Sequence, residues 1–378
     1  NTQMNELNRH TSLVAPGDSK PGMRVWLLLG HKAGDNTQVQ ALADELGWPC
    51  EAKKMFYRPW ELLSNRLLGV TLAGINKRSS SPLHAPWPDL VITAGRRNEP
   101  VARWIREKSG GATRLVHIGR PWAPLDSFDL IVTTPQYFLP ERNSILHNRL
   151  PLYRLDVGKL EAAANKWSQQ FRSLQKPWLA VLIGGDSGPF VFTPQKAALL
   201  GQQVNRRAAA TDASVLISNS ARTPPRALER FLGEIHAPYY LYQWGGSAAN
   251  PYIGYLALAD ELVVTGESIS MLAEAASTGK PLSIFDMSDA GLERVTGIHR
   301  PWWRYLHNFR YKPLTHRLAM RYGPERMRRD IGNIQRELVR SGQAVWLGQQ
   351  PQQPGRYLCA GETQRTAERV RALFEPRV

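Results

Sequence analysis

Short apolar runs alternate with helical patterns along most of the chain. In the first half, the apolar runs typical of buried strands occupy residues 24–30, 89–94, 113–119 and 128–133. Between the first two runs, residues 36–46 carry Val39, Leu42 and Leu46 at helical spacing, and a second helical pattern follows the run that ends at residue 94. This alternation predicts a parallel sheet with helices on both of its faces.

The alternation restarts after a polar helical stretch over residues 159–175, which Pro177 ends. The second half contains apolar runs at residues 178–183, 214–218, 239–244, 262–265 and 282–285. Helical patterns separate them, at residues 194–209, 224–235 and 252–259 and in a stretch that ends at Ser277. Two such halves in one chain predict an α/β fold of two Rossmann-like domains with a ligand cleft between them.

The pattern divides the chain into five segments. They are a polar leader at 1–22, an N-terminal Rossmann-like domain at 23–155, a linker or helix at 156–176, a C-terminal Rossmann-like domain at 177–300, and a basic, aromatic-rich region at 301–378. We expect the leader to be disordered, and it does not resemble a signal peptide because it has no apolar core. The last region is predicted to be helical, and it could pack back on the N-terminal domain.

Residues 263–285 give the most specific pattern of the second half. A β-branched run meets Gly266, a helical pattern follows, Thr278-Gly279-Lys280-Pro281 ends it, and another apolar run begins. This order predicts a strand, helix and strand unit whose helix N-terminus presents unpaired N–H groups and favours anions, above all phosphates. Glu274 lies inside this helix among apolar residues, so it needs an exposed face or a specific partner.

Three polar turns are predicted at the carboxyl ends of strands in the second half. Small or polar residues there can wrap a phosphate, and an arginine among hydroxyls suits a diphosphate. The turn around Ser218–Pro224 could also be a plain helix-capping turn with a surface arginine. Because the three turns end neighbouring strands of one sheet, we expect them to converge on one crevice. Its candidate residues are Gly184, Gly185, Ser218, Ser220, Arg222, Gly266, Glu267 and Ser268.

The first strand of the N-terminal half ends in a second candidate site. Asp35 lies at its carboxyl end and could act as general base on an acceptor hydroxyl, with His31 as the rival for that role. His31, Lys32, Gly34 and Asn36 are the candidates for contact with the acceptor or a phosphate. The alternative is an ordinary strand-to-helix loop in which Asp35 or Asn36 caps the next helix.

The charge of the chain narrows the class of partner. Its 378 residues carry a formal charge of +16, which favours a nucleotide, a phosphorylated glycan, nucleic acid or an acidic membrane face. Diffuse solubilising charge is the alternative. Nucleic acid is disfavoured because no recognition motif accompanies the charge. No apolar run reaches the roughly 20 residues of a membrane span.

Motifs of metal and covalent catalysis are absent from the sequence. Cys50 and Cys359, the two cysteines, have no metal-ligand spacing, which fits a reducing compartment. No Asp-x-Asp, His-x-x-x-His or Gly-x-Ser-x-Gly occurs. We therefore expect a mechanism without metal or cofactor, in which Arg222 and the helix that follows Ser268 stabilise a leaving diphosphate.

Four motifs together carry a resemblance to a known family. They are Gly34-Asp35-Asn36 with Gln38, the Gly184-Gly185 loop, Ser218-x-Ser220-x-Arg222-Thr223-Pro224, and Gly266-Glu267-Ser268. As a set they resemble the ELM1-like family, whose members include a plant mitochondrial fission protein and bacterial proteins treated as glycosyltransferases of lipopolysaccharide core assembly. The resemblance covers residues 23–287.

The resemblance implies a GT-B glycosyltransferase fold, with two Rossmann-like domains whose parallel sheets face each other across a cleft. In such enzymes a glutamate of the nucleotide-sugar helix takes the ribose hydroxyls, and Glu274 matches that position. The donor nucleotide would lie on the residues of the three turns. Tyr242 or Trp244 could contact its base, although the pattern favours core aromatics at both positions.

The leading hypothesis is therefore a metal-independent, inverting glycosyltransferase. It would move a sugar from a nucleotide-diphosphate donor to a hydroxyl of a lipid-linked anionic glycan, such as a lipopolysaccharide core, at the cytoplasmic face of the inner membrane. Arg300-Pro301-Trp302-Trp303-Arg304-Tyr305 suits a lipid interface and motivates the alternative of a non-catalytic membrane adaptor. A nucleotide-sugar epimerase is the third hypothesis, because it can share the fold.

Overall fold

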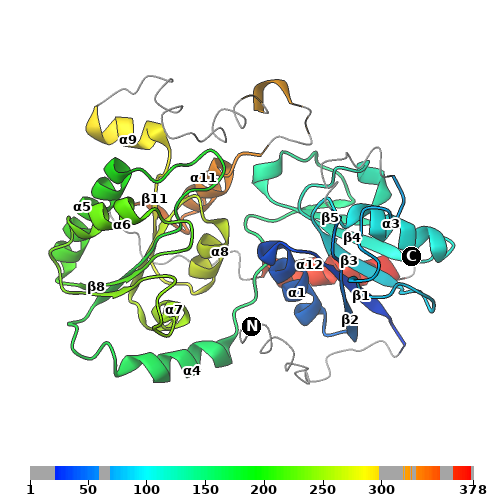
Figure 1. The fold of residues 1–378 in the computed structure, drawn as a ribbon, viewed down its shortest axis with the longest axis horizontal. Helices are drawn as coiled ribbons and strands as arrows, with labels where there is room; N and C mark the ends of the chain where they lie inside the picture. The colour runs from blue at the N-terminus through cyan, green and yellow to red at the C-terminus, as the bar shows by residue number, and fades with distance from the viewer. Residues whose placement is uncertain are drawn as a thin grey trace. The chain divides into compact units, whose positions relative to one another are not determined.

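The computed structural model describes residues 22–58, 69–297, 318, 320–323, 325, 329–349 and 361–375. The chain divides into two compact units (Figure 1). Unit 1 comprises Asn1–Val132 and Thr363–Val378, and unit 2 comprises Thr133–Glu362. Residues 1–21 of the predicted leader and the Arg300–Tyr305 motif lie outside the described residues.

The first sheet has six strands in the order β2-β1-β3-β4-β5-β6. The strands are β1 (Val25–Leu29), β2 (Cys50–Lys54), β3 (Leu90–Ala94), β4 (Arg114–Ile118), β5 (Leu130–Thr133) and β6 (Ile145–His147). Its helices are α1 (Ala33–Leu46) and α3 (Glu99–Lys108), with short 3-10 turns η2 (Leu125–Ser127) and η3 (Pro135–Tyr137). β3 is buried along its whole length because it pairs in parallel with β1 and β4, as its continuous apolar sequence predicts.

Helix α1 begins three residues earlier than its apolar spacing predicts. Its N-cap is Lys32, whose side chain makes no capping bond, and Asp35 lies within the first turn. The Asn36 amide instead binds the backbone of Gly30, accepting from its N–H at 3.0 Å and donating to its carbonyl at 2.8 Å. The prediction that Asp35 or Asn36 caps this helix was therefore wrong, because Asn36 ties the helix back to the end of β1.

The C-terminal residues of the chain complete unit 1. In Figure 1 the red helix α12 (Glu362–Arg371) lies among the blue and cyan elements of this unit. The Arg371 guanidinium donates to the carbonyls of Glu45 and Leu46 at 3.0 and 3.2 Å, so it satisfies the last turn of α1. Phe374, in the 3-10 turn η6 (Ala372–Phe374), packs edge-on against Trp48.

The second sheet also has six strands, in the order β12-β11-β10-β7-β8-β9, and each neighbouring pair is parallel. The strands are β7 (Trp178–Leu182), β8 (Ser214–Ser218), β9 (Tyr239–Tyr242), β10 (Glu261–Thr265), β11 (Leu282–Phe285) and β12 (Val345–Trp346). The helices are α4 (Val157–Ser168), α5 (Pro194–Thr211), α6 (Pro225–Leu232), α7 (Tyr252–Leu258), α8 (Ile269–Ser277), α9 (Asp289–Thr296) and α11 (Gly332–Arg340).

Helices cover both faces of this second sheet. Along β7, Leu179 and Val181 belong to one buried cluster with residues of α5 and α6, whereas Ala180 and Leu182 belong to another with residues of α7, α8 and α11. Successive strand residues point to opposite faces, which produces this division. The range 156–176, which the sequence assigns to a linker or helix, contains α4, whose Trp167 joins the second cluster.

The strand order places one switch point in each sheet. In the first sheet β1 lies between β2 and β3, and in the second sheet β7 lies between β8 and β10. In each sheet, later strands have therefore been added on both sides of the first strand. Ligands of open parallel sheets bind at such a point, beyond the carboxyl ends of the strands. The structure confirms the predicted α/β class with two Rossmann-like units, and each unit has a candidate ligand site at its switch point.

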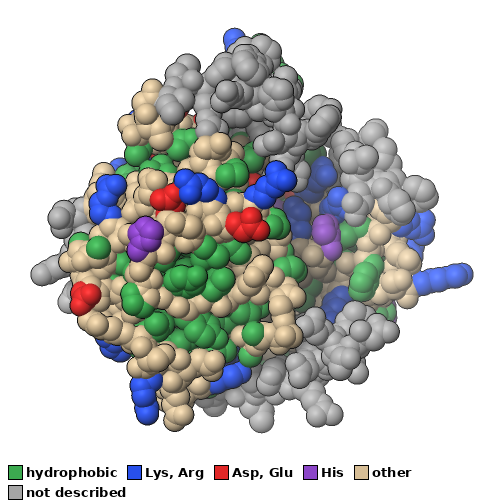
Figure 2. All heavy atoms as spheres, turned by 60° about the vertical axis from the view of Figure 1, so that its left-hand side comes forward, with side chains coloured by type: hydrophobic (Ala, Val, Ile, Leu, Met, Phe, Trp, Pro, Cys, Tyr) green, Lys and Arg blue, Asp and Glu red, His purple; other side chains and the backbone are tan. Residues whose placement is uncertain are grey.

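The basic charge is spread over the molecular surface that Figure 2 shows. Lys and Arg side chains there are scattered among neutral surface and a few Asp and Glu side chains, without forming one continuous stripe. Within the part of the chain that the structure describes, no helix is long and apolar enough to cross a bilayer.

Candidate functional site

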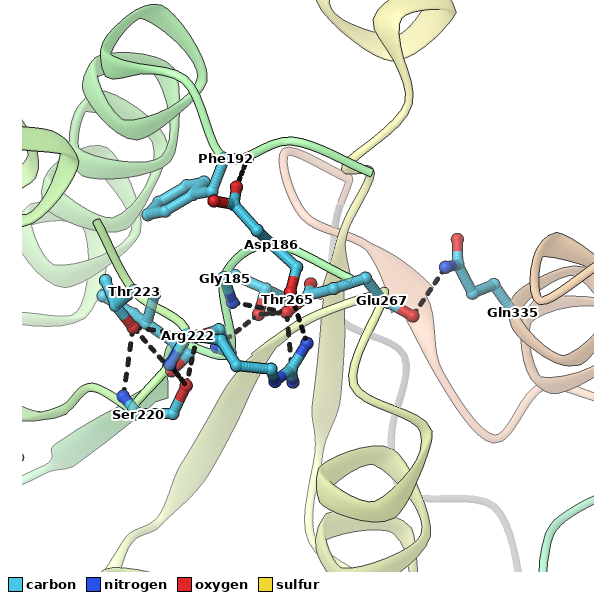
Figure 3. Close-up of polar contacts among 12 residues, drawn as sticks. Gly185, Asp186, Phe192, Ser220, Arg222, Thr223, Thr265, Glu267 and Gln335 are labelled. Carbon is cyan, nitrogen blue, oxygen red and sulfur yellow. Dashed lines mark hydrogen bonds and ion pairs between the residues drawn. The ribbon is translucent and has the colours of Figure 1, made fainter. Parts of the chain in front are cut away.

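Hydrogen bonds join the turns that follow β7 and β10 across the switch point of unit 2 (Figure 3). The Gly184 N–H donates to the Thr265 hydroxyl at 2.8 Å, and the Gly185 N–H donates to Glu267 Oε1 at 2.6 Å. The Thr265 hydroxyl in turn donates to the same Glu267 oxygen at 3.2 Å. The two turns are therefore held together by one carboxyl group and one hydroxyl group.

The turn that follows β8 is joined to the same assembly. The hydroxyls of Ser220 and Thr223 both donate to the Gly184 carbonyl, the second at 2.8 Å. Asp186 N–H donates to the Arg222 carbonyl at 3.1 Å, and Arg222 Nη1 donates to the Asp186 carbonyl at 3.2 Å. The structure thus brings the three predicted turns together, and we call their residues 184–186, 218–223 and 265–268 the turn assembly.

The two glycines that follow β7 in the turn assembly have no room for a side chain. A Cβ at Gly184 would overlap the Glu267 carboxylate, and one at Gly185 would overlap the Arg222 carbonyl. Gly185 also has a φ of +126°, in the region that favours glycine. Both glycines are needed so that backbone from β7 can approach its two neighbours.

Glu267 is the buried centre of the turn assembly. Its side chain is fully buried, and burial raises the pKa of its carboxyl, although the Gly185 N–H and the nearby Arg222 act in the opposite direction. Arg222 Nη2 lies 3.8 Å from Oε1, and Oε2 has no hydrogen-bond partner among the described residues. Glu267 was predicted to bind the donor nucleotide, but its observed contacts are with the turns themselves.

A residue far along the chain also supports this site. Gln335 of α11 donates to the Gly266 carbonyl at 2.6 Å, and it approaches the assembly from the side opposite Arg222 in Figure 3. Gly266 packs directly on the Gln335 amide, which leaves no room for a Cβ. Sequence reasoning missed Gln335, because nothing near it in the sequence indicates contact with a turn about 70 residues earlier.

Helix α8 begins directly behind the turn assembly. Ser268 is its N-cap, and the side chains of Ser268 and Ser218 are both buried. Arg222 is the partly exposed cation of the assembly, with 38% of its side chain accessible. A helix N-terminus beside an arginine is an arrangement that favours a phosphate ligand.

Glu274 lies in the middle of α8 and makes a different contact. The Tyr252 hydroxyl, at the start of α7, donates to its carboxylate. Burial raises the pKa of Glu274, and the hydrogen bond from Tyr252 opposes that shift. The structure therefore pairs the residue that the family resemblance assigns to a ribose with a tyrosine on the neighbouring helix.

The two aromatic candidates at the end of β9 differ in exposure. Tyr242 is buried in the sheet, whereas Trp244 is 55% exposed and its backbone N–H donates to Asn219 Oδ1 at 2.7 Å. An exposed indole that follows the last strand of the sheet is the better platform for a nucleobase. Asn219, which the sequence reasoning left out, fixes the backbone of this platform.

The second candidate site is a pocket at the switch point of unit 1. It lies at the carboxyl ends of β1 and β3 and opens to solvent. Its lining comprises Gly30, His31, Lys32, Asp35, Tyr57, Ala94, Gly95, Arg96, Arg97 and Asn98. Asp35 and its predicted neighbours His31 and Lys32 are therefore together in one cavity, while Gly34 and Asn36 are not among its lining residues.

Basic groups shape the electrostatics of this pocket. Partial burial lowers the pKa of His31, and the positive charges of Arg97 and Lys32 lower it further. Burial also lowers the pKa of Arg97. Arg96 and Arg97 were missed by the sequence reasoning, although Gly95-Arg96-Arg97 directly after a buried strand was a signal that could have indicated them. Among the described residues, no group of three or more His, Cys, Asp or Glu side chains could hold a metal ion.

Comparison of the sequence with known families gives one match that covers more than half of the chain. The mitochondrial fission ELM1 family matches residues 33–304. The mitochondrial fission protein ELM1 of Arabidopsis thaliana is 28% identical over 240 residues, which are 58% of this chain and 56% of the plant protein. This chain thus matches just over half the length of that relative. An uncharacterized Rickettsia prowazekii protein, RP120, is 28% identical over 295 residues, 70% of this chain and 83% of its own length.

Solved structures with a similar arrangement are more distant. The UDP-GlcNAc 2-epimerase of Methanocaldococcus jannaschii is 10% identical, with a TM-score of 0.48 and coverage of 93% of this chain and 99% of its own. A glycosyltransferase of Rickettsia africae is 9% identical, with a TM-score of 0.43 and coverage of 92% and 98%. At these scores the likenesses assign no function.

Proposed function

The chain belongs to the mitochondrial fission ELM1 family, and we propose that it is a metal-independent glycosyltransferase of GT-B type. The observation that carries the proposal is the turn assembly at the switch point of unit 2. There, three strand ends, the N-terminus of α8 and the partly exposed Arg222 form one site that suits the diphosphate of a nucleotide sugar. The nucleobase would stack near Trp244, and Glu274 would accept hydrogen bonds from the ribose hydroxyls.

Unit 1 supplies the acceptor and the base in this proposal. The acceptor oxygen attacks the anomeric carbon while its proton moves to the Asp35 carboxylate. The bond from that carbon to the diphosphate oxygen breaks, and the diphosphate leaves with the electron pair, stabilised by Arg222 and the α8 N-terminus. His31 is the rival base, because its lowered pKa keeps the imidazole neutral and able to accept a proton near pH 7.

The acceptor is proposed to be a lipid-linked anionic glycan such as a lipopolysaccharide core. The formal charge of +16 supports an anionic substrate and peripheral contact with an acidic membrane surface. Direct displacement by the acceptor would invert the anomeric configuration. No cofactor enters this scheme, because the nucleotide sugar is itself a substrate.

A non-catalytic adaptor is the second candidate function. The plant relative supports this candidate, because it is named as a mitochondrial fission protein and not as an enzyme. Turnover separates the two candidates, because an adaptor would neither transfer the sugar nor hydrolyse the donor. Interconversion of a free nucleotide sugar without any acceptor would instead indicate an epimerase.

Calorimetric titration with the common nucleoside diphosphates tests the donor site. We expect at least one of them to bind, and Arg222→Ala to weaken it about 10- to 100-fold, since a hydrogen bond to a charged group is worth about 1.5–3 kcal/mol. Arg226→Ala is the matched control, because Arg226 is an exposed arginine on α6 outside the turn assembly. Failure of the intact chain to bind any nucleoside diphosphate would exclude this function.

A kinetic test follows for unit 1. With a donor identified, Asp35→Asn should abolish transfer and slow donor hydrolysis by at least about 100-fold, the usual contribution of a general base. Its affinity for the nucleoside diphosphate should stay unchanged. If Asp35→Asn keeps its activity and His31→Gln loses it, the base is His31.

A further inference from the structure

We propose that the pocket of unit 1 binds a phosphate group of the acceptor, and that Arg96 and Arg97 are the side chains that recognise it. The inference rests on the proposed function only in calling this ligand an acceptor. Binding of a phosphorylated sugar in the pocket follows from the pocket itself.

The fold gathers the basic side chains of this pocket from two neighbouring strands. Gly95, with a φ of +77°, ends β3 and turns the chain so that Arg96 and Arg97 follow directly at the pocket. His31 and Lys32 come from the end of β1, which pairs with β3 in parallel. Four of the ten lining residues are thus basic, and Asp35 is the acidic one.

Aromatic rings hold the two guanidinium groups. The Arg96 guanidinium carbon lies 4.3 Å from the centre of the Trp122 ring, and that of Arg97 lies 5.6 Å from the centre of the Tyr57 ring. A guanidinium that rests on an aromatic face is oriented by that face, and its N–H groups point outward from its edge. A planar guanidinium placed in this way can bind two phosphate oxygens at once.

The ring beneath Arg97 is itself fixed to the sheet. The Tyr57 hydroxyl donates to the Asn98 side-chain oxygen, and the Asn98 amide donates to the Leu28 carbonyl at 3.1 Å. Asn98 is buried and is also the N-cap of α3. Arg97 is therefore presented by a chain of contacts that begins in β1, so little ordering is needed when a ligand binds.

The charges of the pocket call for an anion. Partial burial lowers the pKa of Arg97, and partial burial together with the positive charges of Arg97 and Lys32 lowers the pKa of His31. A phosphate dianion would interact favourably with Lys32, Arg96 and Arg97, which line the pocket together. The same pocket can then hold a phosphate on its arginines and a hydroxyl at Asp35, which selects an acceptor that carries both groups.

Calorimetric titration of the full chain with glucose 6-phosphate, glucose and UDP tests the proposal. We expect glucose 6-phosphate to bind and glucose to show no measurable affinity. Arg96→Ala/Arg97→Ala should weaken glucose 6-phosphate at least about 10-fold, since each charge-assisted hydrogen bond is worth about 1.5–3 kcal/mol. UDP, as the probe of unit 2, should bind this variant and the wild type within about twofold.

Two further variants keep the test independent of folding. Arg96→Lys/Arg97→Lys retains both charges but loses the planar fork, so we expect it to weaken glucose 6-phosphate while keeping the pocket intact. Arg103→Ala removes an arginine of α3 that is not among the lining residues, and it should bind as the wild type does.

Three outcomes would overturn the proposal. The first is unchanged affinity of both double variants for glucose 6-phosphate, and the second is equal affinity of the wild type for glucose. The third is binding of phosphatidylglycerol vesicles through Arg96 and Arg97 without binding of glucose 6-phosphate, which would assign the arginines to a lipid headgroup. Absence of UDP binding in the wild type would refute the donor site and leave the phosphate result standing.

Discussion

Glu267 is a carboxyl group that the fold removes from water entirely. Its Oε1 accepts from the Gly185 N–H and the Thr265 hydroxyl, and burial raises its pKa. A carboxyl whose pKa is higher in the folded than in the unfolded protein contributes stability below its unfolded pKa, and this is lost as the pH rises through the folded value. Glu267 therefore makes unit 2 less stable in mildly alkaline than in mildly acidic solution.

Glu267→Gln tests this pH dependence. The amide oxygen can still accept from Gly185, but the side chain no longer ionises. We expect the free energy of unfolding to fall less between pH 5 and pH 8 in Glu267→Gln than in the wild type, as urea titrations at both pH values would measure. Glu267→Ala should lose about 1–3 kcal/mol at either pH, because it leaves the Gly185 N–H without its acceptor. A wild type and Glu267→Gln with parallel pH profiles would contradict the raised pKa.

Single residues also show what the sequence could and could not predict. Gly184 and Gly185 were identifiable because small residues directly after a buried strand indicate a close approach of backbone, and the structure shows that approach. The partners of these glycines were not identifiable, since Glu267 lies about 80 residues further along. Asn36 is a local failure, because a capping residue and one that binds the preceding strand end look the same in sequence.

Helix α11 packs against the turn that precedes α8 and stabilises it. Ile334 and Leu338 are fully buried in the core beneath β10 and β11, and Gln335 between them donates to the Gly266 carbonyl. This places one side chain of α11 where a Cβ on Gly266 would lie, at 2.6 Å from its amide nitrogen. The close packing of the turn on α11 therefore depends on Gly266 in the turn and Gln335 in the helix.

A double-mutant cycle measures this fit. We expect Gly266→Ala to lower the free energy of unfolding by about 1–3 kcal/mol, because the new methyl group displaces Gln335 and breaks its hydrogen bond. In a Gln335→Ala background the same substitution should have a clearly smaller effect, as urea denaturation would show. Gly158→Ala in α4 is the control, since its Cβ meets only Asp156 at 3.5 Å and should be neutral or slightly stabilising. An equal effect of Gly266→Ala in both backgrounds would contradict the proposed fit.

The elements that the sequence failed to predict share a physical cause. β2 reads CEAKK, and four of its five residues are exposed at the sheet edge, so it lacks the apolar run that marks a buried strand. β12 has only two residues and lies at the edge of the second sheet, next to β11. Central strands such as β8 and β11 have the predicted boundaries, because burial on both faces demands continuous apolar sequence.

Local sequence patterns do not predict that the chain returns to unit 1 at its C-terminal end. Residues that follow the predicted C-terminal domain divide, because α11 and β12 complete unit 2 whereas α12 belongs to unit 1. Helices α11 and α12 are both amphipathic, so the unit that each one joins depends on complementary surfaces far away in the sequence. Two residues of α12 make these contacts. Val370 is fully buried, and Arg371 donates to a carbonyl at the end of α1.

Removal of Thr363–Val378 should therefore weaken unit 1 and leave unit 2 intact. A chain that ends at Glu362 keeps the hydrogen bonds of that carboxylate to Arg149 and Leu150 within unit 2. It exposes the surface under Val370, whose burial alone is worth about 1.5–3 kcal/mol. Hydrogen exchange should then quicken in β1, β3 and α1 and stay unchanged in β7, β8 and α5. Arg371→Ala, which loses only the bonds to the carbonyls of α1, should give a smaller change confined to the end of that helix. Faster exchange in both units would show that they unfold as one body and that α12 stabilises the whole chain.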